Sequence, residues 1–291
     1  MQGTAKLTVL VVGATGQQGA PIARLLLERG HNVRAMTRKP DGEAAQALSK
    51  LGATIVAGDL EDRSSLDAAL KGVDTVYAIV TPYEAGEDAE TRQGQNLVEA
   101  AHAAGVAHFV YSSVASADRK TGIPHFDSKW RIEEKIHELG VPHTIIRPVF
   151  FMENLNSPMF GSGIASGVFG MAMPGDRSLQ HISLHDLTHF GALVVESRER
   201  FLGADIDIAS DEVTGDHVAS VIANKLGKPL GYTATPIEQV RSYSKDMATM
   251  FEWFDTVGYD SDVAGLRKEY PEVGWQTFDQ WANTVDWKAV S

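Results

Sequence analysis

The sequence contains no cysteine among its 291 residues. This absence excludes disulfide bonds, thiolate nucleophiles and cysteine-held iron–sulfur clusters, and it suits a reducing compartment. No apolar run approaches the roughly 18 residues that a membrane-spanning helix needs. The N-terminal segment is also unlike a signal peptide, because its short apolar stretch leads directly into a glycine-rich turn. We therefore expect a cytoplasmic protein that does not associate with membranes.

The chain also lacks any surplus of positive charge, since its formal net charge is −12. A nucleic-acid-binding surface normally shows a basic patch, so this composition argues against a nucleic-acid partner. The length is sufficient to bury a full core, in one large domain or in two smaller ones.

A glycine-rich stretch near the N-terminus is the most informative motif. The apolar run 9–12 ends in Gly13, Gly16 and Gly19, and an amphipathic pattern follows, which predicts a strand, a tight turn and a helix. Glycines allow a backbone to approach a pyrophosphate closely, and the helix N-terminus then attracts the anion. The alternative is a structural turn in a protein that binds no nucleotide. We expect a dinucleotide to contact Gly13, Thr15, Gly16, Gln17, Gln18 and Gly19.

A basic pair follows the second predicted strand, residues 32–37. A site for unphosphorylated NAD usually has Asp or Glu about 20 residues after the glycines. Here Arg38 and Lys39 occupy that window, and the next acidic residue is Asp41. A planar guanidinium suits a 2′-phosphate, so we expect NADP(H) to be preferred over NAD(H), with Arg38 as the main contact and Lys39 as a helper. The alternative is a solvated basic turn.

Predicted strands at residues 53–57, 73–80, 107–111 and 143–147 alternate with predicted helices. This rhythm is typical of an α/β fold with a doubly wound parallel (Rossmann) sheet. We expect a dinucleotide-binding domain over residues 1–150, a strand near 204–209 that returns to its sheet, and a smaller, interleaved C-terminal α+β lobe over 151–291 on the substrate side. Asp59 is expected either to meet the adenine or to act as a turn residue. Further expected cofactor contacts at the strand ends are Leu60 and Thr81.

Six motifs together resemble a known family. Segments 13–19, 37–40, 58–60 and 111–113 are similar to those of the atypical short-chain dehydrogenase/reductases. Segments 125–129 and 147–154 narrow the resemblance to the NmrA-like group. That group includes NADP-sensing regulators that bind protein partners, and its relatives include quinone reductases and isoflavone-type reductases.

The resemblance also implies catalytic positions. In the wider superfamily a Tyr-x-x-x-Lys pair acts with a serine, and residues four apart share one face of a helix. This sequence has Lys129 and Ser113, but His125 stands at the tyrosine position. Lys129 is expected to bind the nicotinamide ribose or to donate the proton, and His125 to relay a proton. The alternatives are a histidine without a chemical task and a surface lysine beside Glu133. The expected substrate pocket includes Tyr83, Phe151 and Asn154.

Three histidines, His181, His185 and His189, are spaced four apart. The pattern around His181 alternates like a strand, and Asp186 is typical of a helix start, so we expect the three imidazoles not to converge on a metal ion.

Taken together, the motifs and the resemblance predict a monomeric or homodimeric NADPH-dependent reductase of a small apolar carbonyl, quinone or conjugated alkene. The alternative is a catalytically silent NADP(H)-sensing regulator with a protein partner.

Overall fold

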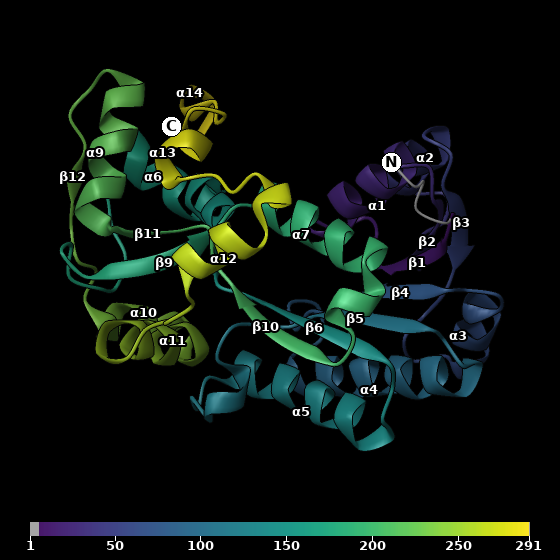
Figure 1. The fold of residues 1–291 in the computed structure, drawn as a ribbon. Coiled ribbons are helices and arrows are strands. Elements are labelled where there is room, and N and C mark those ends of the chain that lie inside the picture. The colour runs from purple at the N-terminus through teal and green to yellow at the C-terminus, as the bar shows by residue number, and fades with distance from the viewer. Residues whose placement is uncertain (1–5, 291) are drawn as a thin grey trace. The chain divides into compact units, whose positions relative to one another are not determined.

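The computed structural model describes residues 6–290, and its centre is a seven-stranded sheet (Figure 1). Each of the pairs β1–β2, β2–β3, β1–β4, β4–β5 and β5–β6 is parallel. In sheet order the strands are β10 (Ala204–Ile208), β6 (His143–Pro148), β5 (His108–Ser112), β4 (Thr75–Ala78), β1 (Thr8–Val12), β2 (Asn32–Thr37) and β3 (Thr54–Ala57). This order confirms the predicted doubly wound Rossmann sheet.

Helices cover both faces of this sheet. In Figure 1, α1 (Gly19–Glu28) and α2 (Glu43–Lys50) lie on one face. The opposite face carries α3 (Arg63–Leu70), α4 (Glu87–Ala104) and α5 (Pro124–Leu139). Burial on both faces explains the apolar run in β1, where Val9, Leu10 and Val11 are fully buried. The strand order reverses between β1 and β4, so the carboxyl ends of these two strands form the switch point where ligands of such sheets bind.

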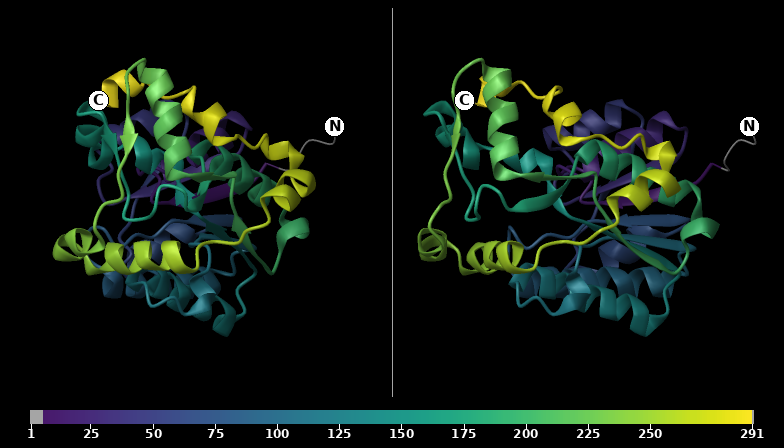
Figure 2. Two further views of the ribbon diagram at one scale, coloured as in Figure 1. Left: turned by 90° about the vertical axis from the view of Figure 1, so that its left-hand side faces the viewer. Right: turned by 60° about the vertical axis from the view of Figure 1, so that its left-hand side comes forward.

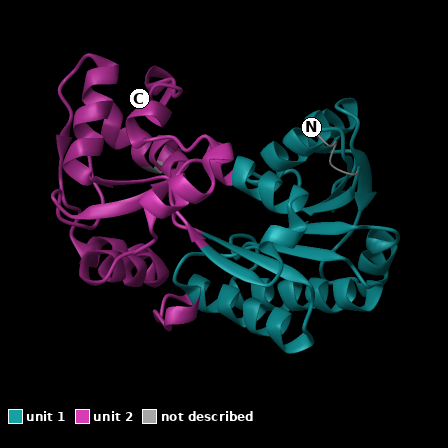
Figure 3. Ribbon diagram, in the orientation of Figure 1, with its two compact units in different colours: residues 1–117, 125–147, 188–206 teal, residues 118–124, 148–187, 207–291 magenta. Residues whose placement is uncertain are grey.

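The chain divides into two compact units (Figure 3). Unit 1 comprises residues 1–117, 125–147 and 188–206, and unit 2 comprises residues 118–124, 148–187 and 207–291. Most of the central sheet belongs to unit 1, while the last residues of β6 and β10 belong to unit 2; unit 1 also holds α8 (Arg198–Phe201). Helix α7 (Leu184–Glu196) and the short η1 (Ala117–Arg119) both span a boundary between the units.

Unit 2 is built on two small sheets. One has the order β11 (Asp211–Thr214), β9 (Ser178–Ile182), β7 (Phe150–Phe151), and the other pairs β12 (Gly231–Tyr232) with β8 (Val168–Phe169). Helices α10 (Ile237–Tyr243) and α11 (Lys245–Thr256) contact each other. They lie side by side in both views of Figure 2. The helical elements are η2 (Met152–Asn156), α6 (Pro158–Ala165), α9 (Gly215–Leu226), α10 (Ile237–Tyr243), α11 (Lys245–Thr256), α12 (Val263–Glu269), η3 (Pro271–Val273), α13 (Phe278–Ala282) and α14 (Trp287–Val290).

Aromatic side chains, together with aliphatic ones, are buried in the core of unit 2. The rings of Trp281 and Trp287 meet edge to face with their centroids 5.8 Å apart. Each buried indole N–H needs an acceptor, and those of Trp275 and Trp287 donate to the carbonyl oxygens of Tyr270 and Ala282, both over 2.9 Å. These packed rings and satisfied indole N–H groups therefore contribute to the stability of unit 2.

None of the helices described over residues 6–290 is both long and apolar enough to traverse a bilayer.

A buried ion pair joins β6 to α5. The side chain of Arg147 is 7% exposed and that of Glu133 is fully buried. The Arg147 Nε atom lies 3.1 Å from both carboxylate oxygens of Glu133, and Nη2 lies 2.5 Å from Oε2. Burial raises the pKa of Glu133, while the hydrogen bonds from Arg147 lower it. A strand with an arginine in its interior is thus stable only because the facing helix supplies a carboxylate.

We expect Arg147→Met to lower the free energy of unfolding by about 3–5 kcal/mol, because it leaves the Glu133 carboxylate buried without its cation. Loss of the arginine also raises the pKa of Glu133 further in the folded state. A carboxyl group whose pKa is raised in the folded state destabilises the protein as the pH rises above its pKa in the unfolded state. The stability lost in Arg147→Met is therefore larger at about pH 8 than at about pH 5. Urea unfolding at both pH values measures this difference.

Two controls accompany this variant. The double variant Arg147→Met/Glu133→Gln removes both charges and regains part of the lost stability. Arg63→Met breaks the exposed pair with Asp67 and costs at most about 1 kcal/mol. A loss at Arg147 no greater than the loss at Arg63, at either pH, contradicts the assigned role.

Candidate functional site

The glycine turn lies at the switch point between β1 and β4. Gly13 has a φ of +72°, and a Cβ atom built there would lie 3.1 Å from the carbonyl oxygen of Ile79, just after β4. At Gly19 a Cβ atom would lie 2.1 Å from the carbonyl oxygen of Gly13, which no side chain allows. The N–H of Gly16 donates to that same oxygen over 3.0 Å. Glycine at positions 13 and 19 thus brings the start of α1 directly against the end of β1.

The start of α1 is suited to an anion. Gln18 stands at the N-cap but forms no capping hydrogen bond with its side chain. The N–H of Ala20 donates to the carbonyl oxygen of Gly16 over 3.0 Å and Pro21 has no N–H, so what a ligand meets here is the positive end of the helix dipole and the backbone of the turn. The Gln18 Oε1 atom instead accepts from Ser112 Oγ at the end of β5, over 2.9 Å. Thr15, Gly16 and Gln17 are exposed. An exposed turn with little side-chain bulk at a helix N-terminus fits the diphosphate of a dinucleotide.

The two basic residues after β2 are exposed. The Arg38 Nη2 atom forms an ion pair with Oε2 of Glu84, and the side chains are 56% and 68% exposed. The Lys39 backbone N–H donates to Thr37 Oγ1 over 3.1 Å, which fixes the turn. An exposed ion pair is weak, so the guanidinium can exchange Glu84 for a phosphate.

Several expected contacts lie at the carboxyl edge of the sheet. Asp59 follows β3, and its Oδ1 atom accepts from the N–H of Glu61 over 2.9 Å, as a turn residue does. The carbonyl oxygen of Leu60 accepts from Asn96 Nδ2 on α4 over 2.9 Å. Thr81 is exposed just beyond β4, and Tyr83 is 89% exposed.

Lys129 lies against the carboxyl end of β4. Its Nζ atom donates to the carbonyl oxygen of Val80 over 3.0 Å and to Oε1 of Glu90 on α4 over 2.7 Å. Glu90 is fully buried, and its Oε2 atom also accepts from Ser128 Oγ over 2.5 Å. The alternative interpretation, a surface lysine beside Glu133, is wrong, because Lys129 is 12% exposed and Glu133 pairs with Arg147.

Ser113 and His125 lie in different segments of unit 1. Ser113 directly follows β5, is 4% exposed, and donates its hydroxyl proton to Oε1 of Glu133. His125 is in the first turn of α5, one helical turn before Lys129, and its ring meets Phe126 edge to face with centroids 4.8 Å apart.

Tyr111 on β5 is poorly suited to supply the missing tyrosine hydroxyl. It is fully buried, and its hydroxyl makes no hydrogen bond within the described part of the chain. Burial raises the pKa of Tyr111 well above its ordinary value, which opposes proton transfer.

The remaining candidates belong to unit 2. Phe151 is on β7, in register with Ile182 of β9, and Asn154 lies in η2; both are half-buried. Next to Asn154, Glu153 accepts from the N–H of Leu184 over 3.0 Å and from Trp281 Nε1 over 2.9 Å. Burial raises the pKa of Glu153. Glu153 therefore fixes the segment on which Asn154 lies.

The three histidines spaced four apart do not all lie on one element: one is on β9 and two are on α7. His181 is buried on β9, where Nδ1 contacts the carbonyl oxygen of Leu179 at 2.8 Å, and burial lowers its pKa to about 4. His185 and His189 are on α7, and Nδ1 of His185 lies 3.0 Å from Oδ1 of Asp186. The predicted change from strand to helix between His181 and His185 is present.

Sequence reasoning missed Glu90 and Glu133, the buried carboxylates that hold Lys129 and Ser113. A signal existed for one of them. Arg147 directly follows the buried apolar residues Ile145 and Ile146 in β6, and a buried cation requires a buried carboxylate elsewhere. Glu90, by contrast, stands in an acidic first turn beside Glu87 and Asp88, so nothing local distinguishes it.

Comparisons with known proteins place the chain among its relatives. The model of the NmrA-like family matches residues 5–282. An NAD(P)H azoreductase of Xenophilus azovorans is 31% identical over 236 residues, which is 80% of this chain and 79% of that protein. A quinone oxidoreductase of Escherichia coli, NADPH-dependent and solved with NADPH, superposes with a TM-score of 0.78 at 24% identity, covering 96% of this chain and 99% of that one.

The negative transcriptional regulator NmrA, solved with NADP, superposes with a TM-score of 0.79 at 22% identity, covering 97% of this chain and 99% of that one. These two structures share the fold with the present chain. The match of the family model over nearly the whole sequence shows more: the chain belongs to the NmrA-like family.

Proposed function

We propose that this protein binds NADP(H) and reduces a small apolar carbonyl, quinone or conjugated alkene. The observation that carries the proposal is Lys129, held by buried Glu90 at the carboxyl end of β4, in the same unit as the glycine turn. Holding an ammonium in a largely buried position costs free energy. Charged groups placed in this way cluster at functional sites, and this one lies beside the switch point. The azoreductase, at 31% identity, supports a reductase by its name.

The cofactor contacts follow from the geometry of unit 1. The backbone of the glycine turn and the positive end of the α1 dipole would hold the diphosphate, with Gly13 and Gly19 allowing its close approach. Arg38 and Lys39 would hold the 2′-phosphate once Arg38 releases Glu84. Asp59, Leu60 and Thr81 would contact the rest of the cofactor at the strand ends.

The chemistry requires a hydride and a proton. A bound nicotinamide would supply the hydride. The Ser113 hydroxyl already donates its one proton to Glu133, so we assign the proton that reaches the substrate to His125 or Lys129. An ammonium has three donors, and two of those on Lys129 are engaged by Val80 and Glu90. The third is available to the nicotinamide ribose or to the substrate oxygen.

A second candidate function is a catalytically silent NADP(H) sensor with a protein partner. The observation that favours it is His125, which stands where the superfamily's catalytic tyrosine is expected, while Tyr111 is too deeply buried to replace that tyrosine. The likeness to the regulator NmrA adds the fold alone. The two candidates agree on the nucleotide and differ in turnover.

We expect Arg38→Ala to weaken NADPH binding about 10–100-fold and NADH binding little, because a hydrogen bond to a charged phosphate contributes about 1.5–3 kcal/mol. Glu84→Gln has the opposite sign: it removes the competing carboxylate and strengthens NADPH binding by at most about fivefold. Isothermal titration calorimetry with both nucleotides measures these changes.

Arg63→Ala is the matched control, since Arg63 is another exposed arginine paired with a carboxylate. It leaves both affinities unchanged. Equal affinity of the wild type for NADPH and NADH, together with no effect of Arg38→Ala, excludes the basic pair as the phosphate site. Binding of neither nucleotide excludes the dinucleotide site itself.

We expect the wild type to oxidise NADPH in the presence of at least one member of a quinone, aldehyde and enone panel, and replacing Lys129 to lower kcat about 10²–10⁴-fold. Lys129→Met alone leaves Glu90 buried without its cation. The informative variant is therefore Lys129→Met/Glu90→Gln, with Glu90→Gln alone as control, and stopped-flow absorbance follows the oxidation.

The affinity for NADPH is measured for each variant, so that loss of binding is separated from loss of turnover. His125→Gln tests the relay in the same assay. If the wild type binds NADPH but oxidises none across the panel, the reductase is excluded and the sensor is favoured. A partner capture that differs between the nucleotide-bound and nucleotide-free protein is then the next measurement.

A further inference from the structure

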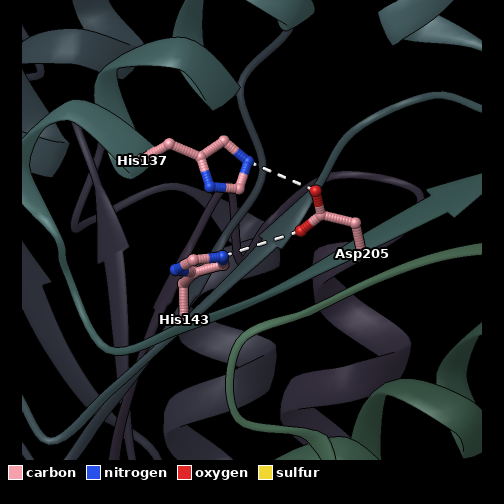
Figure 4. Close-up of side chains that lie close together, drawn as sticks. All are labelled: His137, His143 and Asp205. Atoms are coloured by element: carbon pink, nitrogen blue, oxygen red, sulfur yellow. Dashed lines mark ion pairs between the residues drawn. The ribbon is translucent and has the colours of Figure 1, made fainter.

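Two histidines and an aspartate converge at the edge of the central sheet (Figure 4). His137 is in the last turn of α5, His143 begins β6 and Asp205 is on β10, all within unit 1. His137 Nε2 lies 3.2 Å from Oδ2 of Asp205, and His143 Nε2 lies 3.6 Å from Oδ1. One ligand atom from each residue lies within 4.8 Å of the other two.

The ring of His143 is held with one nitrogen directed at Asp205. Its Nδ1 atom is 2.8 Å from the carbonyl oxygen of Val141, which can only accept, so Nδ1 carries a proton. Such a backbone contact is the usual way in which a metal-ligating histidine is oriented. The opposite nitrogen, Nε2, is buried and makes no hydrogen bond among the described residues.

The distances between the histidine nitrogens and the Asp205 oxygens are similar to those between neighbouring ligand atoms of a zinc site. Zinc binds histidine nitrogen and carboxylate oxygen at about 2.0–2.2 Å in a tetrahedral arrangement, which separates neighbouring ligand atoms by roughly 3.3–3.5 Å. The two separations from Asp205, 3.2 and 3.6 Å, are close to this size but end on different carboxylate oxygens, so binding one ion requires a small movement of a histidine. The rings of His137 and His143 meet edge to face, with centroids 4.8 Å apart, and both direct Nε2 toward Asp205 (Figure 4). His137 is 40% exposed and can make this movement.

The charge around Asp205 also permits a cation. Arg147 Nη2 lies 3.3 Å from Oδ2 of Asp205, but Arg147 is engaged more closely by Glu133. The negative charge of Asp205 is therefore only partly compensated. The sequence contains no cysteine, so no thiolate competes for a borderline metal ion.

We propose that His137 Nε2, His143 Nε2 and the Asp205 carboxylate form a binding site for Zn²⁺ or a similar divalent transition-metal ion, with a solvent water as fourth ligand. The site joins the end of α5, the start of β6 and the edge strand β10. It does not depend on the proposed reductase function, and it is tested in the absence of nucleotide.

The test uses the full chain without a histidine tag, stripped of metal, and titrated with Zn²⁺ alone in a calorimeter. We expect one ion per chain with micromolar affinity, and a visible absorption band when Co²⁺ is added instead. His137→Gln, His143→Gln and Asp205→Asn each weaken Zn²⁺ binding by at least about tenfold, since loss of a direct ligand costs no less than loss of an outer-shell partner.

His217→Gln is the matched control. His217 is an exposed histidine 2.7 Å from the carboxylate of Asp279, a pair without a second histidine, and the substitution leaves Zn²⁺ affinity unchanged. Zn²⁺ also raises the melting temperature of the wild type and of His217→Gln, but not that of His137→Gln, whose exposed position leaves the fold intact. Submicromolar or micromolar binding retained in His137→Gln, or no binding by the wild type, overturns the proposal.

Discussion

The close approach of α1 to β1 is the constraint on which the rest of unit 1 depends. A side chain at position 19 would occupy the same space as the carbonyl oxygen of Gly13, and one at position 13 would crowd Ile79 beside β4. Because both positions are glycine, the helix can begin directly over the place where the strand order reverses. Longer side chains would move the helix start outward, and with it the positive end of the helix dipole that makes this edge attractive to an anion.

Around this turn, unit 1 places its buried charges in pairs that each join two elements. Glu90 on α4 holds Lys129 on α5, and Glu133 on α5 holds Arg147 on β6. The serine hydroxyls of residues 113 and 128 complete the hydrogen bonds of these carboxylates. A half-paired buried charge would be strongly unfavourable, so these pairs favour a single position of α5 relative to the sheet. That position in turn decides where Lys129 and His125 lie.

Much of unit 1 could be predicted from the sequence, because its signals are local. Apolar, β-branched runs such as residues 9–12 predict buried strands, and glycines at φ above zero mark the turns between elements. The partners of the charged residues could not be predicted in the same way. Lys129 is four residues from Glu133 in sequence, yet it pairs with Glu90, 39 residues away. Such a choice depends on how α4 and α5 pack, which no periodicity within either helix records.

Unit 2 was harder to predict for a different reason. Strands β7, β8 and β12 are two residues long, too short to show an alternating pattern. The aromatic residues of its C-terminal segment identify a core but not its topology. Among the candidate site residues, those that backbone geometry requires to be glycine, such as Gly13 and Gly19, were the easiest to predict from the sequence. The exposed Arg38 and Tyr83 are positioned by weaker local signals.

The division into units has a consequence for how the protein is made. The chain passes from one unit to the other five times, and unit 1 is completed only by residues 188–206. During synthesis on the ribosome, β6 therefore has an unpaired edge until β10 emerges, after the whole segment 148–187 has been translated. Neither unit can be produced by a single truncation, and a nascent chain arrested before residue 204 would present that open edge to chaperones.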